Sequence, residues 1–348
     1  MYPLNPPGES APILDVRHLS IAIGGGQSRF DAVNDLTFSV RPGKTLAIVG
    51  ESGCGKSLTA LSLMRLLPDN VSISGGEISI GDQDLVKLSG RGMEKLRGSA
   101  ISMIFQDPMT SLNPLVRIGR QISEAIRIHR GISASQARER ALELLELVGV
   151  SDAPRRLDQF PHELSGGMRQ RVMIASAMAG EPKVIVADEP TTALDVTVQS
   201  QILALLKNLQ RQTSMALVLI THDFGVVAQM ADEVAVMYAG RIVEYGNAIE
   251  VFNDPLHPYT RGLLSCSRQG LCKSERVKAG MGLEQIPGTV IPLIARGKGC
   301  NFADRCSHAT DICRSHDPHQ SCSPTDHRMV ECWHVHDASG TPGKVAHQ

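Results

Sequence analysis

The sequence predicts an α/β fold that carries an inserted helical subdomain and a small cysteine-rich C-terminal extension. Short, continuous apolar runs alternate with segments of helical periodicity, as expected for buried parallel strands connected by helices. The stretch from about 107 to 179 is mostly helical, and after about Asn253 the periodicity fades while Pro, Cys, His and Gly become frequent. We therefore expect a flexible N-terminus over residues 1–12, a main domain over 13–252 and an extension over 253–348.

The predicted strands and helices follow from the spacing of apolar residues. Residues 14–23 and 32–40 alternate apolar and polar side chains, as half-buried strands do. Thr45–Val49 is continuously apolar and ends at a glycine, which is typical of a buried parallel strand, and residues 56–67 form a helix that ends before Pro68. Ser133-x-x-Gln136 is a capping-box pattern that opens a helix, and Gly149 ends it.

Two more buried strands are expected at 184–187 and 216–220, with a helix between them. Apolar residues at helical spacing predict that helix: Val198, Ile202, Leu205, Leu206 and Leu209.

Composition and charge exclude several classes of protein. The chain has 348 residues, more than one hydrophobic core usually holds. Lys and Arg number 35 against 36 for Asp and Glu, so the chain lacks the basic field that nucleic acid usually requires. No apolar run approaches the roughly 20 residues that span a bilayer. The N-terminus has no Lys or Arg before Arg17 and no long apolar core, unlike a secretory signal. We expect a cytosolic chain that reaches a membrane only through a partner.

A glycine-rich segment directly after the strand at 45–49 predicts a phosphate-binding loop. Residues 50–57 read GESGCGKS and fit the pattern G-x-x-x-x-G-K-[ST] between a strand and a helix. Glycines let backbone amides surround a triphosphate, Lys56 neutralises its β- and γ-phosphates, and the Ser57 hydroxyl binds Mg²⁺. The predicted nucleotide contacts are Gly50, Ser52, Gly53, Cys54, Gly55, Lys56, Ser57 and Leu58. Cys54 is interpreted as a backbone contact, with a redox switch as the alternative.

Carboxylates and a histidine end the other buried strands. Residues 184–190 read VIVADEP, so Asp188 is expected to help hold Mg²⁺ and Glu189 to act as the general base toward water. His222 follows the strand at 216–220 and is expected at the edge of the γ-phosphate. Gln106, after the apolar run 101–105, is expected to reach Mg²⁺ or the attacking water. The chain is thus predicted to hydrolyse a nucleoside triphosphate with Mg²⁺.

A second phosphate-binding helix start follows at 164–170, with the sequence LSGGMRQ. One chain already has its own loop, so this segment is redundant unless it serves a second nucleotide. With this segment, the P-loop, Gln106, VIVADEP, ALD at 193–195 and THD at 221–223, the sequence closely resembles the ABC-type ATPases over roughly residues 13–250.

The resemblance implies a head-to-tail pair in which each ATP lies between one P-loop and the partner's signature segment. It implies contacts with the partner's nucleotide for Ser165, Gly166, Gly167 and Gln170, and a place at the dimer interface for Asp195. The family usually stacks adenine on an aromatic residue of the first strands. Ile23 holds that position here and Phe30 is the nearest aromatic residue, so the adenine contact is left open.

Further segments resemble the ATPases of oligopeptide and dipeptide importers: FQDPMTSLNP at 105–114, ALDVTVQ at 193–199 and HPYT at 257–260. The resemblance implies import of di- or oligopeptides, with nickel, glutathione or an oligosaccharide as alternatives. It implies a second ATPase subunit, commonly a paralogue, two membrane permeases contacted through residues 107–120, and indirectly an extracytoplasmic solute-binding protein. The chain would then lie at the cytoplasmic face of the bacterial inner membrane.

Eight cysteines are unevenly distributed, and five fall in the last 49 residues. In a cytosolic chain such a group suggests metal binding before disulfides. The spacing resembles relatives that carry a [4Fe–4S] cluster, with Zn or a metal-free cysteine-rich loop as the alternatives. The ligands are predicted to be Cys300, Cys306, Cys313 and Cys332, with Cys322 as an alternative fourth ligand.

Two other functional classes remain alternatives. A soluble ABC ATPase of DNA repair or translation usually carries a long coiled-coil insert or a second cassette, and neither is visible here. A regulatory cassette that does not hydrolyse ATP is disfavoured because Glu189 and His222 are intact.

Overall fold

The computed structural model describes residues 10–26, 29–192, 194–271, 286–292, 294, 296–322 and 328–335. Most of the N-terminal stretch 1–12, Ala193 of the ALD segment and the side chain of Cys322 lie outside the described residues. None of the helices within the described ranges is both long and apolar enough to cross a bilayer.

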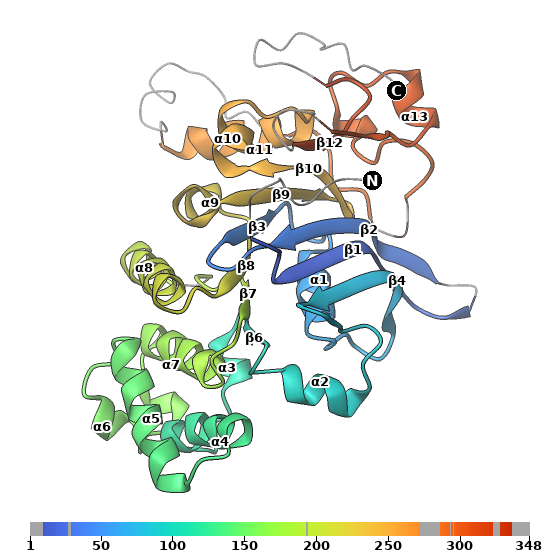
Figure 1. Ribbon diagram of the computed structural model, residues 1–348. Coiled ribbons are helices and arrows are strands. Elements are labelled where there is room, and N and C mark those ends of the chain that lie inside the picture. The colour runs from blue at the N-terminus through green and yellow to red at the C-terminus, as the bar shows by residue number, and fades with distance from the viewer. Residues whose placement is uncertain are drawn as a thin grey trace.

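The strands form two sheets, which lie side by side in Figure 1. The smaller, antiparallel sheet has the order β2-β1-β4-β5, and the larger has the order β11-β12-β10-β9-β3-β8-β7-β6. The smaller sheet consists of β1 (Leu14–Ile23), β2 (Phe30–Val40), β4 (Val71–Ile80) and β5 (Gln83–Asp84). The larger sheet consists of β3 (Thr45–Val49), β6 (Ile101–Ile104), β7 (Val184–Asp188), β8 (Ala216–Thr221), β9 (Glu233–Tyr238), β10 (Arg241–Asn247), β11 (Gln320–Cys322) and β12 (Met329–Glu331).

The central strands are apolar throughout because both of their faces are covered. Every residue of β3, β7 and β8 is buried. On β7, Val184 and Val186 pack toward the smaller sheet and α1, while Ile185 and Ala187 pack toward the helical part. Successive side chains of a strand point to opposite faces of the sheet. A parallel strand that is covered on both faces therefore needs apolar residues at every position. The predicted buried strands are confirmed.

Helices α1 (Lys56–Leu63) and α2 (Gly90–Leu96) lie near the smaller sheet in Figure 1. The prediction that the first helix runs to residue 67 is wrong by one turn. Met64 is its C-cap, and Arg65 takes a left-handed conformation with φ of 49°. The guanidinium of Arg65 then donates to the carbonyl oxygens of Leu85 and Leu88, at 3.0 and 2.5 Å. Tertiary hydrogen bonds therefore end the helix before Pro68 does.

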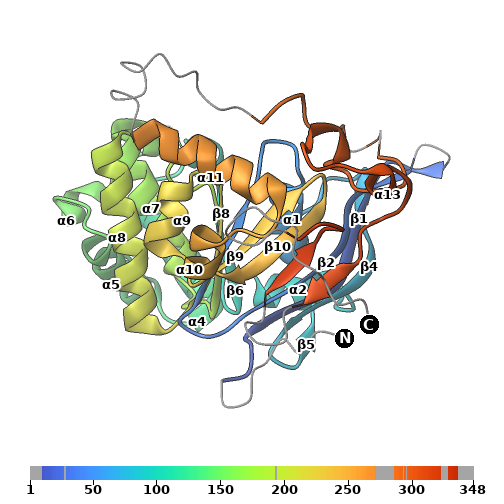
Figure 2. The same cartoon turned by 90° about the horizontal axis from the view of Figure 1, so that it is seen from above.

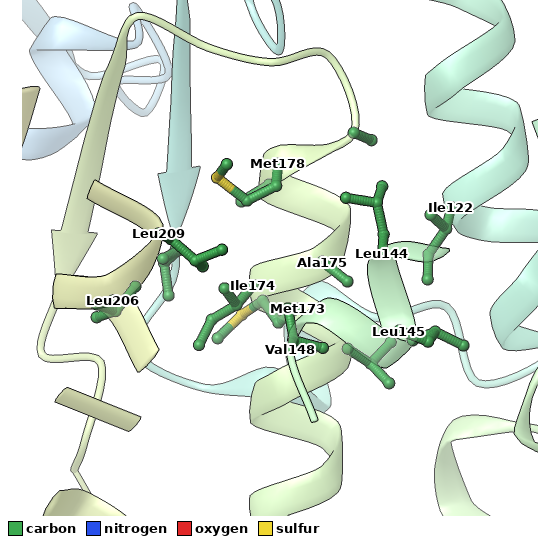
Figure 3. Packing of buried hydrophobic residues seen from close by; sticks show 14 of the residues in the cluster. Ile122, Leu144, Leu145, Val148, Met173, Ile174, Ala175, Met178, Leu206 and Leu209 are labelled. Carbon is green, nitrogen blue, oxygen red and sulfur yellow. The ribbon is translucent and has the colours of Figure 1, made fainter. Parts of the chain in front are cut away.

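The inserted helices share one apolar core with α8 and one face of the larger sheet, part of which is shown in Figure 3. The predicted capping box at Ser133 and Gln136 is confirmed, with both reciprocal hydrogen bonds present. Ile122, Leu145 and Ile174, from three different helices, are fully buried in this core. The helices are α3 (Pro108–Ser111), α4 (Ile118–Arg130), α5 (Ala134–Leu147), α6 (Ala153–Arg156), the 3-10 turn η2 (Pro161–Glu163) and α7 (Gly166–Met178).

The remaining helices cover the larger sheet and form part of the extension, as Figure 2 shows from above. Ile202, Leu206 and Leu209 of the predicted helix between β7 and β8 are buried, while Val198 and Leu205 are partly buried. These helices are α8 (Val196–Thr213), α9 (Phe224–Met230), α10 (Ala248–Asn253), α11 (Pro258–Leu271), the 3-10 turn η4 (Ala303–Arg305) and α13 (Asp311–Ser315).

The C-terminal extension is joined to the main sheet, which the sequence did not predict. β12 pairs antiparallel with β10, and β11 pairs with β12. Glu244 of β10 is fully buried and accepts hydrogen bonds from the backbone amides of Leu256 and His257, at 2.8 and 2.9 Å, and from the Arg328 guanidinium at 2.9 Å. A buried carboxylate is stable only when its oxygens are paired in this way. Glu244 therefore joins the start of the extension to its last described strand.

We predict that Glu244→Ala lowers the free energy of unfolding by about 3–5 kcal/mol, because it leaves the buried guanidinium of Arg328 without this carboxylate. Urea unfolding followed by circular dichroism measures the change. Lys87→Ala, which removes a surface ion pair with Asp84 at 2.8 Å, is the control, with a loss of at most about 1 kcal/mol. Equal small losses in both variants would contradict the role given to Glu244.

Candidate nucleotide-binding and hydrolysis site

The residues singled out in the sequence gather at one edge of the larger sheet. β3, β8, β7 and β6 are mutually parallel in that order, so their carboxyl ends lie at the same edge. The P-loop follows β3, Asp188 ends β7, His222 follows β8 and Gln106 lies two residues after β6. Ligands of open α/β sheets bind at this edge.

Close packing and backbone conformation require glycine at two positions of the loop 50–57. A Cβ atom on Gly50 would collide with the Met237 carbonyl oxygen of β9. Gly55 has φ of 106°, and a Cβ there would meet the side chains of Met237 and Val33 at 2.9 and 3.0 Å. No side chain caps the N-terminus of α1. The first-turn amides are therefore available to an anion, as the pattern predicts.

Lys56 spans this loop. Its side chain is buried, and Nζ donates to the carbonyl oxygens of Gly50 at 2.7 Å and Glu51 at 2.9 Å. The ammonium is thus held inside the curve of the loop, where phosphate oxygens would be neutralised. Ser52 and Gly53 are exposed on the loop, whereas the Leu58 side chain packs against the core.

Cys54 is fully buried in the loop. Burial raises the pKa of its thiol above the ordinary value, although the nearby Lys56 ammonium opposes this shift. A neutral, inaccessible thiol is a poor nucleophile. The geometry therefore favours the interpretation of Cys54 as a backbone contact over the redox switch.

Ser57 and Asp188 form an oxygen-rich pair between the loop and the strand end. Ser57 Oγ lies 3.4 Å from Asp188 Oδ1. Burial is the main cause that raises the pKa of the Asp188 carboxyl, and the hydrogen bond from Ser57 opposes it. A buried carboxyl beside a hydroxyl is a donor set that suits a hard divalent cation, whose charge would favour the ionised form.

Glu189 is the point on which the other polar side chains converge. Gln106 Nε2 and Thr192 Oγ1 donate to its Oε2 at 3.1 and 2.8 Å, and His222 Nδ1 lies 2.9 Å from its Oε1. Its backbone has φ of 46°, an uncommon conformation for a non-glycine residue that is often found at functional sites. Burial acts to raise the pKa of Glu189, but the hydrogen bonds from His222 and Thr192 outweigh it and lower the pKa.

Thr192 was not singled out in the sequence. It lies three residues after Glu189, and its amide donates to the Glu189 carbonyl oxygen at 3.1 Å. This short turn brings the hydroxyl back to the carboxylate. The sequence places two threonines, Thr191 and Thr192, directly after Pro190. Only the geometry of the turn shows that the second of them binds the Glu189 carboxylate.

The start of the signature segment lies apart from the P-loop. Ser165 caps α7 by accepting from the Met168 amide at 3.4 Å, and Ser165 and Gly166 are exposed while Gly167 is half-buried. In Figure 1, α7 lies with the inserted helices, away from α1. Among the described residues, no hydrogen bond joins 164–170 to the loop 50–57. The chain's own P-loop and signature segment therefore do not form one site.

Gln170 is the last residue of the signature segment. Its side chain is buried, and Nε2 donates to the Pro190 carbonyl oxygen at 2.5 Å. Its predicted contact with a nucleotide on another subunit stays a prediction. Gln170 holds the residue that follows Glu189 and so connects the signature helix to the carboxylate cluster.

Asp195 and the adenine candidates lie outside the cluster. Asp195 is exposed and caps α8 by accepting from the Val198 amide at 2.9 Å. Ile23 and Phe30 face each other in the register of β1 and β2, so both candidates lie at the same end of that pair. Phe30 also lines a cavity of about 250 Å³ together with Arg241 and Arg296.

The four predicted cysteine ligands meet in the extension. Cys300, Cys306, Cys313 and Cys332 line one cavity of about 20 Å³. Burial raises the pKa of Cys300 to about 11 and of Cys332 to about 12, and it also raises the pKa of Cys306. Within the described ranges, however, no group of three or more His, Cys, Asp or Glu side chains is close enough together to hold a metal ion as it stands.

Comparisons with known proteins agree with this geometry. The family model described as ABC transporter matches residues 33–192, and the model for the oligopeptide/dipeptide transporter, C-terminal region, matches residues 243–313. The oligopeptide transport ATP-binding protein OppD of Salmonella typhimurium is 48% identical over 312 residues, which cover 90% of this chain and 91% of that protein. A Brucella abortus protein named for peptide import and ATP binding is 47% identical over 324 residues, 93% of this chain and 95% of its own length.

Solved structures show the same fold. The dimeric post-hydrolysis ATP-binding cassette MJ0796, bound to ADP and Pi, superposes with a TM-score of 0.61 at 27% identity, covering 68% of this chain and 98% of that one. CbiO1 from Clostridium perfringens superposes with a TM-score of 0.60 at 30% identity, covering 70% and 91%. The chain belongs to the ABC transporter ATP-binding proteins of the oligopeptide and dipeptide importer family.

Proposed function

We propose that this ABC ATPase energises the import of di- or oligopeptides, with Glu189 as the general base of ATP hydrolysis. The convergence of Gln106, Thr192 and His222 on Glu189, beside the P-loop edge, carries this proposal. The lowered pKa keeps the carboxylate ionised at neutral pH and able to accept a proton from water. The peptide substrate is inferred from the names of the relatives OppD and the Brucella protein.

In the proposed reaction, a water oxygen bonds to the γ-phosphorus while the bond from that phosphorus to the β–γ bridging oxygen breaks. Glu189 takes the proton of the water, and ADP leaves with the bridging oxygen. Lys56 and the loop amides hold the phosphate oxygens, and His222 orients Glu189 at the γ-phosphate edge. Ser57, Asp188 and Gln106 would hold Mg²⁺, which would supply charge neutralisation to the phosphates.

The signature segment is proposed to serve the nucleotide of a second ATPase subunit, commonly a paralogue in this family. The exposed start of α7, which makes no hydrogen bond to the chain's own P-loop among the described residues, supports this pairing. Ser165, Gly166 and Gly167 would contact that nucleotide, and Asp195 would lie at the interface.

Residues 107–120 are proposed to dock a membrane permease. Two large apolar side chains of this segment, Met109 and Leu115, are 52% and 85% exposed. Large exposed apolar side chains can mark a surface that another protein covers. Two permeases and an extracytoplasmic solute-binding protein would complete the importer, with this chain at the cytoplasmic face of the inner membrane.

The four-cysteine cavity is proposed to hold a [4Fe–4S] cluster, with Zn as the alternative. Four thiols that line one buried cavity support a thiolate site, and their raised pKa values describe the metal-free, neutral form. A bound group would draw Cys300, Cys306, Cys313 and Cys332 together and cross-link the extension.

Glu189→Gln is expected to lower the steady-state rate of ATP hydrolysis by roughly 10²–10⁴-fold, because the amide cannot accept the proton, while ATP binding is retained. Phosphate release from the reconstituted transporter measures the rate. Glu143→Gln, on the surface of α5, is the control. Wild-type turnover in Glu189→Gln would refute the assignment of the general base.

Lys56→Ala is expected to weaken ATP binding by roughly 10–100-fold, since the ammonium held by Gly50 and Glu51 is lost. Equilibrium titration with a fluorescent ATP analogue and Mg²⁺ gives the dissociation constant. Lys44→Ala serves as the comparison. Lys44 directly precedes β3, the strand that leads into the loop, and pairs with Asp232. An unchanged constant for Lys56→Ala would count against the P-loop assignment.

Anaerobically purified protein is expected to absorb near 400 nm and to contain about four iron atoms per chain. Cys306→Ser should lose both signals, whereas Cys266→Ser, in α11 outside the cavity, should keep them. Bound zinc without iron would contradict the cluster and support the alternative metal. The absence of both metals would contradict a metal site.

A further inference from the structure

The extension reaches the nucleotide site through Glu51, the second residue of the P-loop. The Glu51 amide donates to the hydroxyl of Tyr259 at 2.9 Å, and the Glu51 carbonyl oxygen accepts from Lys56 at 2.9 Å. The Glu51 carboxylate accepts two hydrogen bonds from the guanidinium of Arg305, at 2.6 and 3.0 Å. Each polar group of Glu51 is therefore bound, and two of its partners, Tyr259 and Arg305, belong to the C-terminal extension.

Several contacts fix the Arg305 side chain in the position from which it binds Glu51. Its side chain is 4% exposed, and Nε donates to the Pro287 carbonyl oxygen at 2.8 Å. The guanidinium also lies 5.8 and 5.9 Å from the ring centres of Tyr238 and Phe302. The two parallel hydrogen bonds to a carboxylate are the strongest geometry available to arginine. A guanidinium fixed on so many sides holds Glu51 in one position.

Tyr259 provides the second contact from the extension. It is fully buried at the start of α11, and its ring packs against Tyr238 at 4.7 Å and Phe302 at 5.3 Å between ring centres. Burial raises the pKa of its hydroxyl, which therefore stays neutral and available as an acceptor for the Glu51 amide. Phe302 also lines the cysteine cavity, so the same aromatic group supports both places.

Arg305 also neutralises the charge of the Glu51 carboxylate. A carboxylate within a loop that binds a triphosphate would repel its ligand, and such repulsion is stronger where water is partly excluded. The Arg305 guanidinium pairs with that carboxylate and leaves the positive charge of Lys56 and the loop amides to act on the phosphates. The sequence distance between the partners is 254 residues, so this neutralisation depends entirely on the docked extension.

We propose that Arg305 is a positioning residue of the nucleotide site, which holds and neutralises Glu51 so that the P-loop is preformed for ATP. The proposal rests on the binding of nucleotide at this loop. It makes the C-terminal extension part of the ATP site, although it contributes no group to the reacting atoms.

The test measures the dissociation constant of a fluorescent ATP analogue for the full chain with Mg²⁺. Arg305→Ala is expected to weaken binding roughly 10-fold, because the Glu51 carboxylate becomes unpaired beside the phosphates. Adding Glu51→Gln to Arg305→Ala removes that charge and is expected to recover at least half of the lost affinity. Arg314→Ala, which removes an exposed ion pair with Asp304 in the same extension, is the matched control and should bind as the wild type does.

Steady-state kinetics of the reconstituted transporter separates positioning from chemistry. Arg305→Ala should raise the KM for ATP and leave kcat close to the wild-type value, since Arg305 touches no reacting atom. A fall in kcat as large as the rise in KM would overturn the proposal, and so would failure of Glu51→Gln to recover affinity. In either case Arg305 would act through packing alone. A folded Arg305→Ala chain with wild-type affinity would overturn it as well.

If Arg305→Ala does not fold, Arg305→Lys provides the test. Lysine keeps the charge but cannot make two parallel hydrogen bonds, so a smaller loss of affinity is expected and an unchanged constant would overturn the proposal. Wild-type protein that fails to bind the analogue in the same assay would refute nucleotide binding at the loop, an outcome distinct from the failure of Arg305 alone.

Discussion

Parallel pairing of β3, β8, β7 and β6 is the constraint on which the site depends. Strands that run in one direction bring their carboxyl ends to one edge, and each end here carries a different polar group. Residues as far apart in sequence as Gln106 and His222 thus meet on one carboxylate. Apolar side chains cover both faces of β7, which packs against the smaller sheet and α1 on one side and against the helices on the other.

Two adjacent carboxylates acquire different properties from their surroundings. Asp188 is the last residue of β7, and burial raises its pKa, while its pairing with the Ser57 hydroxyl gives a donor set that suits a cation. Glu189 leaves the strand in a left-handed conformation that places its carboxylate among hydrogen-bond donors, which lower its pKa. A pair of acids with opposite pKa shifts is a common way to divide tasks in a hydrolytic site. Gln170 of the signature helix α7 donates a hydrogen bond to the carbonyl oxygen of Pro190, the residue after Glu189. It therefore connects this helix to the two carboxylates.

The extension is an integral part of the ATPase rather than a separate appendage. Its strands continue the main sheet, Glu244 binds both residues 256–257 and Arg328, and Arg305 and Tyr259 reach the P-loop. The turn that carries Arg305 directly precedes Cys306, so the residues of the cysteine cavity and of the phosphate loop share one structural unit. A metal site there would stabilise a segment with little helical periodicity of its own.

The sequence by itself determined the buried strands, the glycine-rich loop 50–57, the capping box at Ser133 and the placement of Asp188, Glu189, His222 and Gln106 at or just after strand ends. Each depends on local information: an apolar run, a glycine spacing, or a polar residue placed directly after a strand. Only the tertiary structure decided that Thr192 reaches Glu189, that Gln170 is directed inward, and that α1 ends at Leu63. It also decided that Arg305 pairs with Glu51 across 254 residues, because long-range contacts depend on how the elements pack and leave no periodic trace in the chain.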